Sequence, residues 1–316
     1  MTRLRQRATV LAFLLAWRAL RLLPARLAYL LFDLAADRTH RADGPSVQRL
    51  RANYARVRPE LSADDLERLV ADGVRASLRY YVEAFRLPAV SGEHVDSVVR
   101  FEGAMPQLKA DLLAGRPVLA FLGHTGNWDL AGVWCARHLG TVVTVAERLE
   151  PEEMFRAFLD YRESLGMVIH PAERGTFVRL REQLATGEPV VMPLLADRDL
   201  SASGVEVDLC GHRARMAAGP AALAVETGLP LYPVTLRHER VGGTWGMVVT
   251  VHDAVAVAPA SAPDAVARTT QACANAFGSA IREHTADWHM MQRVFVDDLD
   301  PARDAARREA SRREVA

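Results

Sequence analysis

The hydrophobic positions divide the chain into a helical N-terminal part and a part in which two patterns alternate. Between residues 46 and 87, large apolar residues recur three or four positions apart, with a break at Pro59. This spacing is typical of one buried face of a helix. Ser62, followed by Asp64 and Asp65, predicts the start of the second helix in this region. We therefore expect residues 1–99 to form a helical extension.

From Arg100 onward, short apolar runs alternate with helical stretches. The runs typical of buried strands are 118–122, 142–145, 167–170, 190–195, 231–236 and 247–251. Helical spacing occurs at 105–114, 128–138, 151–165, 175–186, 217–227 and 264–284. This alternation predicts an α/β fold over residues 100–299, with a mostly parallel central sheet and helices on both faces. Residues 300–316 are charged and poor in large apolar residues, so we expect a flexible tail.

Composition excludes several classes of protein. The 316 residues carry 39 basic and 39 acidic side chains, so no net charge favours nucleic acid as a partner. The three cysteines are far apart and form no CxxC, which predicts free thiols. No GxSxG, P-loop or strand-borne GxGxxG occurs, and no His, Asp or Glu set has metal-ligand spacing. We expect neither a metal nor a cofactor.

The N-terminus has the pattern of a membrane-surface helix. Six arginines precede the first acid, Asp33, and the apolar run at residues 8–17 is about half of the roughly twenty residues that a bilayer span needs. We expect Leu, Phe and Trp side chains to enter the acyl boundary while the arginines contact anionic headgroups. The alternative is an ordinary helix packed on the core. Arg18 and Arg21 follow the run directly, which disfavours a signal peptide.

The candidate chemistry begins at His124. This residue follows the apolar run 118–122 and Gly123, and Asp129 lies in the first turn of the next helix. Open α/β sheets bind their ligands at the carboxyl ends of the strands, where His124 is expected. A carboxylate bonded to one ring nitrogen would leave the other nitrogen as a general base. The simpler alternative is that Asp129 only favours the helix N-terminus through the helix dipole.

The residues around His124 carry a family resemblance. GHTGNWDLAGVW is similar to the first motif block of the lysophospholipid acyltransferase superfamily, in the branch of the lipid A lauroyl/myristoyl acyltransferases. More closely, the chain resembles the actinobacterial phosphatidylinositol mannoside acyltransferases, through NYARVRPELS, VAERLEPEEMFRAFLDYRESLG, LLADRDLSASGVEVDLCGHRARMAAGPAALAVETGLPLYPV and ADWHMMQRVF. The resemblance runs from about residue 8 to about residue 299.

This resemblance implies a membrane-associated enzyme on the cytoplasmic face of the plasma membrane. It would move a palmitoyl-like chain from acyl-CoA, as co-substrate, to a mannose hydroxyl of a phosphatidylinositol mannoside. His124 would act as the base in a direct transfer without an acyl-enzyme, because a thioester is already activated. A long apolar groove should hold the acyl chain. The implied partners are acyl-CoA, the glycolipid and an anionic membrane surface.

The resemblance also implies roles for further residues. Asp129 is the second member of the His-x4-Asp motif, while Asp197 in LADRDL stands where relatives carry a glutamate that contacts the histidine. Asp197 is one methylene shorter, so either aspartate could be the partner of His124, and a local turn would also explain Asp197. Arg162 is expected to face the site, and backbone N–H groups near Asn127 and Trp128 could receive an oxyanion or phosphate.

Five weaker candidates for substrate contacts are Glu147, Arg148, Arg198, Glu206 and Arg215. A surface hairpin would explain Glu206 and Arg215 equally well, and a salt bridge would explain Arg198. Trp288, His289 and Met290 are expected to pack beneath the site.

Other functions stay open from the sequence. The chain could use another glycolipid or lysolipid acceptor, or an acyl carrier protein as donor. From other classes, it could be a thioesterase, or an inactive lipid-binding scaffold that keeps the fold.

Overall fold

The computed structural model describes residues 13, 15–148, 150–199 and 204–299. A seven-stranded sheet has the order β1-β9-β8-β2-β5-β3-β4. All of its pairings are parallel except β8 with β9. The prediction of an α/β fold with a mostly parallel sheet is confirmed. The strands are β1 (Val99–Gly103), β2 (Val118–Leu122), β3 (Thr141–Ala146), β4 (Met167–Pro171), β5 (Val190–Leu195), β8 (Leu231–Val241) and β9 (Thr244–Val251).

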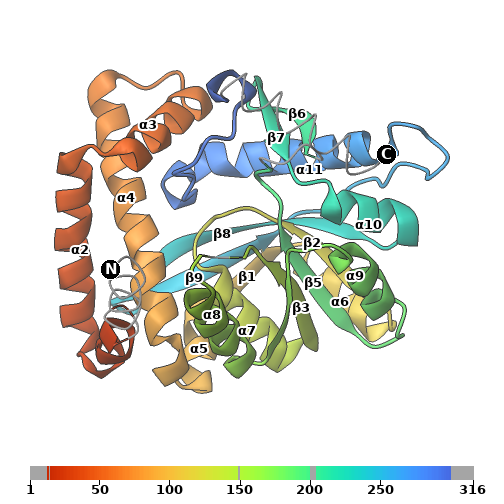
Figure 1. Cartoon of the computed structure of the whole chain (residues 1–316), viewed down its shortest axis with the longest axis horizontal. Coiled ribbons are helices and arrows are strands. Elements are labelled where there is room, and N and C mark those ends of the chain that lie inside the picture. Colours follow the sequence, from red (N-terminus) through yellow and green to blue (C-terminus); the bar gives the residue numbers. More distant parts are fainter. Residues whose placement is uncertain (1–12, 14, 149, 200–203, 300–316) are drawn as a thin grey trace.

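Helices cover both faces of this sheet (Figure 1). One face packs against α5 (Gly92–Val98), α6 (Met105–Leu113), α7 (Trp128–His138) and α8 (Glu152–Ser164). The other face packs against α9 (Thr176–Leu184), α10 (Gly219–Thr227) and α11 (Ala265–Glu283). Three short 3-10 helices are Leu87–Ala89, Thr285–Asp287 (η2) and Val296–Asp298.

The strands go beyond the predicted apolar runs in three places: β1 is not among those runs, β8 is longer than predicted, and a separate two-stranded sheet is present. β8 continues five residues past the predicted end, as a hairpin with β9 that turns at Gly242 and Gly243, both at positive φ. Its outer half is polar, which hides it from a search for apolar runs. A second, antiparallel hairpin is formed by β6 (Val205–Leu209) and β7 (His212–Met216). This is the hairpin that would explain Glu206 and Arg215 without a binding role.

The N-terminal helices belong to the same core as the sheet. They are α2 (Ala25–Ala42), α3 (Pro45–Val57) and α4 (Ala63–Arg86), and they stand beside β8 and β9 in Figure 1. Ser62 caps α4, its side chain accepting from the Asp65 N–H, as predicted. Buried residues of α3 and α4, including Leu50 and Val70, join the cluster that contains Phe121 of β2.

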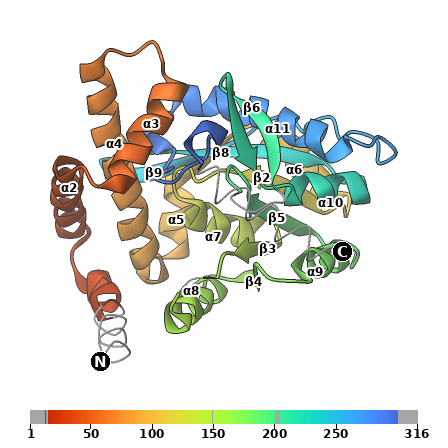
Figure 2. The same ribbon diagram turned by 45° about the horizontal axis from the view of Figure 1, so that its top comes forward.

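The N-terminal segment differs from the prediction at Trp17. Residues 8–12 and 14 of the apolar run 8–17 lie outside the described residues, but residues 15–22 are helical. Trp17 is only 5% exposed, packs against Phe85 and Phe158, and donates its indole N–H to the Phe85 carbonyl. Trp17 therefore sits in the protein rather than in a lipid boundary, because an aromatic pocket and a hydrogen-bond acceptor are provided there. Within the described part of the chain, no helix is long and apolar enough to cross a membrane. Figure 2 shows this segment at the edge of the molecule, next to α2.

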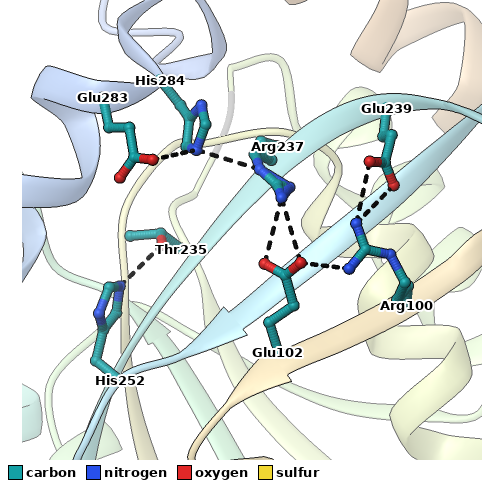
Figure 3. Close-up of polar contacts among 8 residues, drawn as sticks. All are labelled: Arg100, Glu102, Thr235, Arg237, Glu239, His252, Glu283 and His284. Carbon is teal, nitrogen blue, oxygen red and sulfur yellow. Dashed lines mark hydrogen bonds and ion pairs between the residues drawn. The ribbon is translucent and has the colours of Figure 1, made fainter.

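Polar side chains also join β1 to β8 and to the end of α11 (Figure 3). Arg237 donates to Glu102 at 3.2 Å, and Arg100 donates to Glu239 at 2.8 Å. His284 lies 3.2 Å from Arg237. These pairs lie at the partly solvent-exposed surface, where an ion pair contributes little to the free energy of unfolding.

Candidate active site

His124 and Asp197 come from the ends of two adjacent strands. Leu122, the last residue of β2, pairs in register with Leu195, the last residue of β5. His124 and Asp197 each follow two positions after the end of their strand. The Nδ1 atom of His124 lies 2.6 Å from Oδ1 of Asp197, and the backbone N–H of His124 donates to Oδ2 at 2.9 Å. The strand order therefore brings together two residues that are 73 positions apart in sequence.

The loop at Gly123 packs closely against α11, and this close packing lets the short Asp197 side chain reach His124. A Cβ atom at Gly123 would lie 2.2 Å from the Phe277 ring, so only glycine lets the loop sit this near α11. The same Cβ would lie 3.2 Å from Oδ2 of Asp197. The aspartate at this position, one methylene shorter than the glutamate that the resemblance implied, thus reaches His124 directly.

The Asp197 carboxylate is fully buried and accepts three hydrogen bonds. The third comes from Nε1 of Trp288 at 2.9 Å. Burial raises the pKa of Asp197, but the attraction of His124 and these hydrogen bonds outweigh it, so the pKa lies below its ordinary value. With Asp197 ionised, Nδ1 of His124 carries the proton. The His124 side chain is 31% exposed, which leaves Nε2 accessible as an acceptor.

Asp129 has different partners. Its carboxylate accepts from Nε of Arg162 at 2.8 Å and from the hydroxyl of Tyr80 at 2.9 Å. Asp129 is 2% exposed, so this pair is buried. The alternative in which Asp129 orients the His124 ring directly is not the arrangement found: Asp197 holds the ring, and Asp129 holds Arg162. Arg162 faces the same region, as the resemblance implied.

The start of α7 lies beside His124. Asn127 caps the helix, its side-chain oxygen accepting from the Leu130 N–H at 3.0 Å and its amide donating to Glu83 at 2.9 Å. The Trp128 ring stacks on Tyr80 with 4.1 Å between centroids and meets the His124 ring edge-on at 5.6 Å. The N–H groups of Trp128 and Asp129 belong to the first turn, where helices leave donors free for an anion.

An apolar cavity opens next to this site and runs beneath α7. It holds about 830 Å³ of space not filled by atoms, including the part open to solvent. Trp128, Asp129, Arg162 and Leu195 line one end, at the carboxyl edge of the sheet. Leu139, Val142 and Val191 line the other end. Because α7 rises about 1.5 Å per residue, the eleven positions from Trp128 to Leu139 span roughly 16 Å.

The weaker candidates pair mainly with one another. Arg198 contacts Glu147 at 3.3 Å, and Arg148 contacts Glu152 at 2.9 Å. Glu206 and Arg215 lie opposite each other on β6 and β7, with 3.4 Å between them. The hairpin adjoins the Asp197 loop, because the Asp199 N–H donates to the Arg215 carbonyl.

Sequence reasoning missed a buried polar cluster behind His124. His238 of β8 lies between Asp287, at 2.7 Å, and Glu83 of α4, at 3.4 Å. Burial by itself lowers the pKa of His238. The two carboxylates raise the pKa by more than burial lowers it, and the result is a pKa of about 9. His289 is next to it, and burial together with the His238 charge lowers its pKa to about 3. Possible ligand atoms of His238, Asp287 and His289 lie within 4.8 Å of one another. No local spacing reveals this cluster, because it joins α4, β8 and η2.

Comparisons with known proteins agree with the resemblance. Residues 2–296 match the model of the bacterial lipid A biosynthesis acyltransferase family. The chain is 40% identical over 304 residues to the phosphatidylinositol mannoside acyltransferase of Mycolicibacterium smegmatis, covering 94% of each chain. It is also 40% identical over 305 residues to the protein of that name from Mycobacterium tuberculosis, covering 94% of this chain and 92% of the relative.

The raised pKa of His238 predicts a pH dependence of stability. Because His238 binds its proton more tightly in the folded state, its contribution is complete below its ordinary pKa and is lost as pH rises through about 9. A His238→Gln variant should lack this dependence, which amounts to about 3 kcal/mol in the free energy of unfolding. Urea unfolding at pH 6 and pH 9.5 measures it.

The matched control is His138→Gln, which removes an exposed histidine bonded to Asp96 at 2.6 Å. This change should leave the pH dependence of the wild-type protein almost intact. Equal slopes for the wild-type and His238→Gln proteins would contradict the prediction.

Proposed function

The chain belongs to the bacterial lipid A biosynthesis acyltransferase family, and on this premise we propose that it transfers a long fatty acyl chain from acyl-CoA to a mannose hydroxyl of a phosphatidylinositol mannoside. The observation that carries the proposal is the pair of His124 and the buried Asp197, next to Trp128, which lines one end of the apolar cavity. The names of the two mycobacterial relatives support the acceptor.

In the proposed reaction, Nε2 of His124 takes the proton of the acceptor hydroxyl as its oxygen attacks the thioester carbonyl. Asp197 stabilises the imidazolium that forms. The C–S bond then breaks, and the departing thiolate takes the proton from His124, giving free coenzyme A and an acylated lipid. The N–H groups of Trp128 and Asp129 are suited to stabilise the oxyanion. No acyl-enzyme is needed.

We assign the acyl chain to the cavity beneath α7. Its lining is mainly apolar, and the buried pair of Asp129 and Arg162 lies at one end. A thioester placed there would have its chain in the cavity and its carbonyl near His124. The Arg162 guanidinium is also suited to a phosphate of the donor or the acceptor, while Glu147, Arg148, Arg198, Glu206 and Arg215 remain weaker candidates.

The outer face of α2 supports a peripheral position on the membrane. Leu27, Leu30, Leu31 and Leu34 are between 42% and 55% exposed and share one face of the helix, while Ala28 and Ala36 on the opposite face are buried. Such a stripe fits the acyl boundary of a bilayer. Because acyl-CoA is a cytosolic donor, we place the protein on the cytoplasmic face of the plasma membrane.

Simultaneous measurement of free thiol and acylated lipid tests the proposal. With palmitoyl-CoA and vesicles containing phosphatidylinositol mannosides, both products should appear in equal amounts, and His124→Ala should lower the rate by at least about a hundredfold. Asp197→Asn should cost much more activity than Asp199→Asn, because Asp197 holds the His124 ring.

Other outcomes identify the alternatives. Thiol without acylated lipid would indicate a thioesterase or a different acceptor. Activity only with acylated acyl carrier protein would change the donor. Lipid binding without turnover, unaffected by His124→Ala, would indicate a scaffold.

The cavity predicts control of acyl-chain length at Cys135. This residue lines the cavity about two turns into α7, so Cys135→Leu should block its deeper half. We expect the preference for palmitoyl-CoA over decanoyl-CoA to fall by about tenfold or more, comparable to filling the space of several methylenes. Cys135→Ala, which adds no volume, is the control and should keep the wild-type preference. An unchanged preference in Cys135→Leu would place the chain elsewhere.

The α2 stripe predicts where the membrane contact lies. The combination of Leu27→Ser, Leu30→Ser and Leu34→Ser should lower binding to anionic vesicles by about tenfold or more. Burying one exposed leucine side chain in the bilayer contributes roughly 1.5 kcal/mol to the free energy of binding. Co-sedimentation measures the binding. The combination of Leu113→Ser, Phe177→Ser and Val178→Ser, which removes exposed apolar side chains from α6 and α9 instead of α2, is the matched control and should leave the binding unchanged. Equal sedimentation of the triple variant and the wild-type protein would rule this face out.

A further inference from the structure

The segment after α11 runs along the free side of the loop that carries His124. The Gly126 N–H donates to the Asp287 carbonyl at 3.0 Å, and the His289 N–H donates to the His124 carbonyl at 2.8 Å. Between them, Thr125 and Trp288 form an antiparallel bridge. The loop is therefore held by backbone hydrogen bonds beyond the end of β2, where a loop would otherwise be free to move.

Trp288 contacts the loop that carries His124 through its backbone and Asp197 through its side chain. Its backbone lies opposite the His124 loop, while its fully buried indole donates to Oδ2 of Asp197 at 2.9 Å. The ring packs edge-on against Phe277, with 6.3 Å between centroids. Phe277 is also the residue against which Gly123 packs. One residue thus fixes the distance between the loop and the carboxylate.

The N-terminal helices hold Trp288 in turn. The Tyr54 hydroxyl of α3 donates to the Trp288 carbonyl at 2.9 Å. The neighbouring Asn53 donates to the carbonyls of Met290 and Gln292 at 2.8 and 2.9 Å. Both α3 side chains are almost completely buried. A Cβ at Gly73 of α4 would lie 2.3 Å from the Tyr54 hydroxyl, so the glycine leaves the space that the Tyr54 ring occupies.

We propose that Trp288 and Tyr54 are positioning residues for the reaction: the Trp288 indole fixes the Asp197 carboxylate, and Tyr54 fixes Trp288. An N–H donor to a buried carboxylate favours its ionised form and removes its freedom to rotate away from the imidazole. The helical part before residue 99 thereby takes part in catalysis through α3. This inference rests on the acyl transfer proposed above.

Trp288→Phe tests the first link, because it keeps an aromatic ring but removes the indole N–H; the ring volume that it also removes is matched by the control variant below. We expect kcat to fall about tenfold, the rate equivalent of one hydrogen bond to a charged acceptor. The low-pH limb of the kcat profile should move to higher pH, because a carboxylate that has lost a donor is protonated more readily. The KM for acyl-CoA should change little, since neither Trp288 nor Tyr54 lines the cavity.

Trp17→Phe is the matched control. It also removes one buried indole hydrogen bond, the 3.2 Å bond to the Phe85 carbonyl, but lies away from the Asp197 carboxylate. It should leave kcat and the pH limb unchanged. A loss of kcat in Trp17→Phe equal to that in Trp288→Phe would reduce the effect to general packing and overturn the proposal.

Tyr54→Phe tests the second link and remains decisive if Trp288→Phe does not fold. It should lower kcat by about threefold, as expected for one neutral hydrogen bond, and move the pH limb in the same direction. The double variant should lose less than the product of the two single losses, because both act through Asp197. Wild-type kcat and pH limb in either single variant would overturn the corresponding link.

A direct spectroscopic measurement separates this inference from the proposed function. The indole N–H resonance of Trp288, assigned by its loss in Trp288→Phe, should shift when Asp197→Asn removes the carboxylate charge. If the resonance shifts on Asp197→Asn but the wild-type protein transfers no acyl group, the proposed function is refuted while the contact between Trp288 and Asp197 stands. If the chemical shift of the Trp288 indole N–H is unchanged by Asp197→Asn, the positioning role is refuted.

Discussion

The buried carboxylate of Asp197 is the constraint on which the rest of the site depends. An ionised group with no exposed surface is costly unless each of its oxygens finds donors. Here the donors come from the His124 ring, the His124 backbone and the Trp288 indole. They belong to the end of β2 and to the segment after α11, so the site forms only when the sheet, α11 and the segment that follows are all in place.

Two aspartates near His124 are separated in role by their neighbours. Asp197 faces an imidazole and holds it in one tautomer, while Asp129 faces the guanidinium of Arg162 and the hydroxyl of Tyr80. Because Arg162 compensates the charge of Asp129, that carboxylate is not free to act on His124. The pair instead places a charged contact at one end of a cavity whose lining is otherwise mainly apolar. This arrangement suits a substrate with a polar head and a long hydrocarbon chain.

The helices before residue 99 are more than an attachment to the sheet. α4 contributes Tyr80 to the Asp129 pair and Glu83 to the buried cluster around His238. α3 reaches the active site through Tyr54 and Trp288. The outer face of α2 carries exposed leucines, while the inner face packs on the molecule. The surface that we propose for the membrane and the residues that position the carboxylate therefore belong to one continuous helical layer.

The sequence by itself determined the elements that depend on local patterns. The runs at 118–122 and 190–195 match β2 and β5 because consecutive apolar residues are typical of strands buried on both faces. Ser62 marked the start of α4, because capping is a contact within one turn. The motif around His124 also indicated the family. The sequence did not predict the outer half of β8, because this part of the strand is polar and contains no apolar run. Only the tertiary structure decided that Asp197, rather than Asp129, holds His124, that Trp17 is buried, that His238 lies behind the site, and that Trp288, expected to pack there, donates to Asp197. These contacts join residues far apart in the chain, and strand order and helix packing, which no local spacing encodes, bring them together.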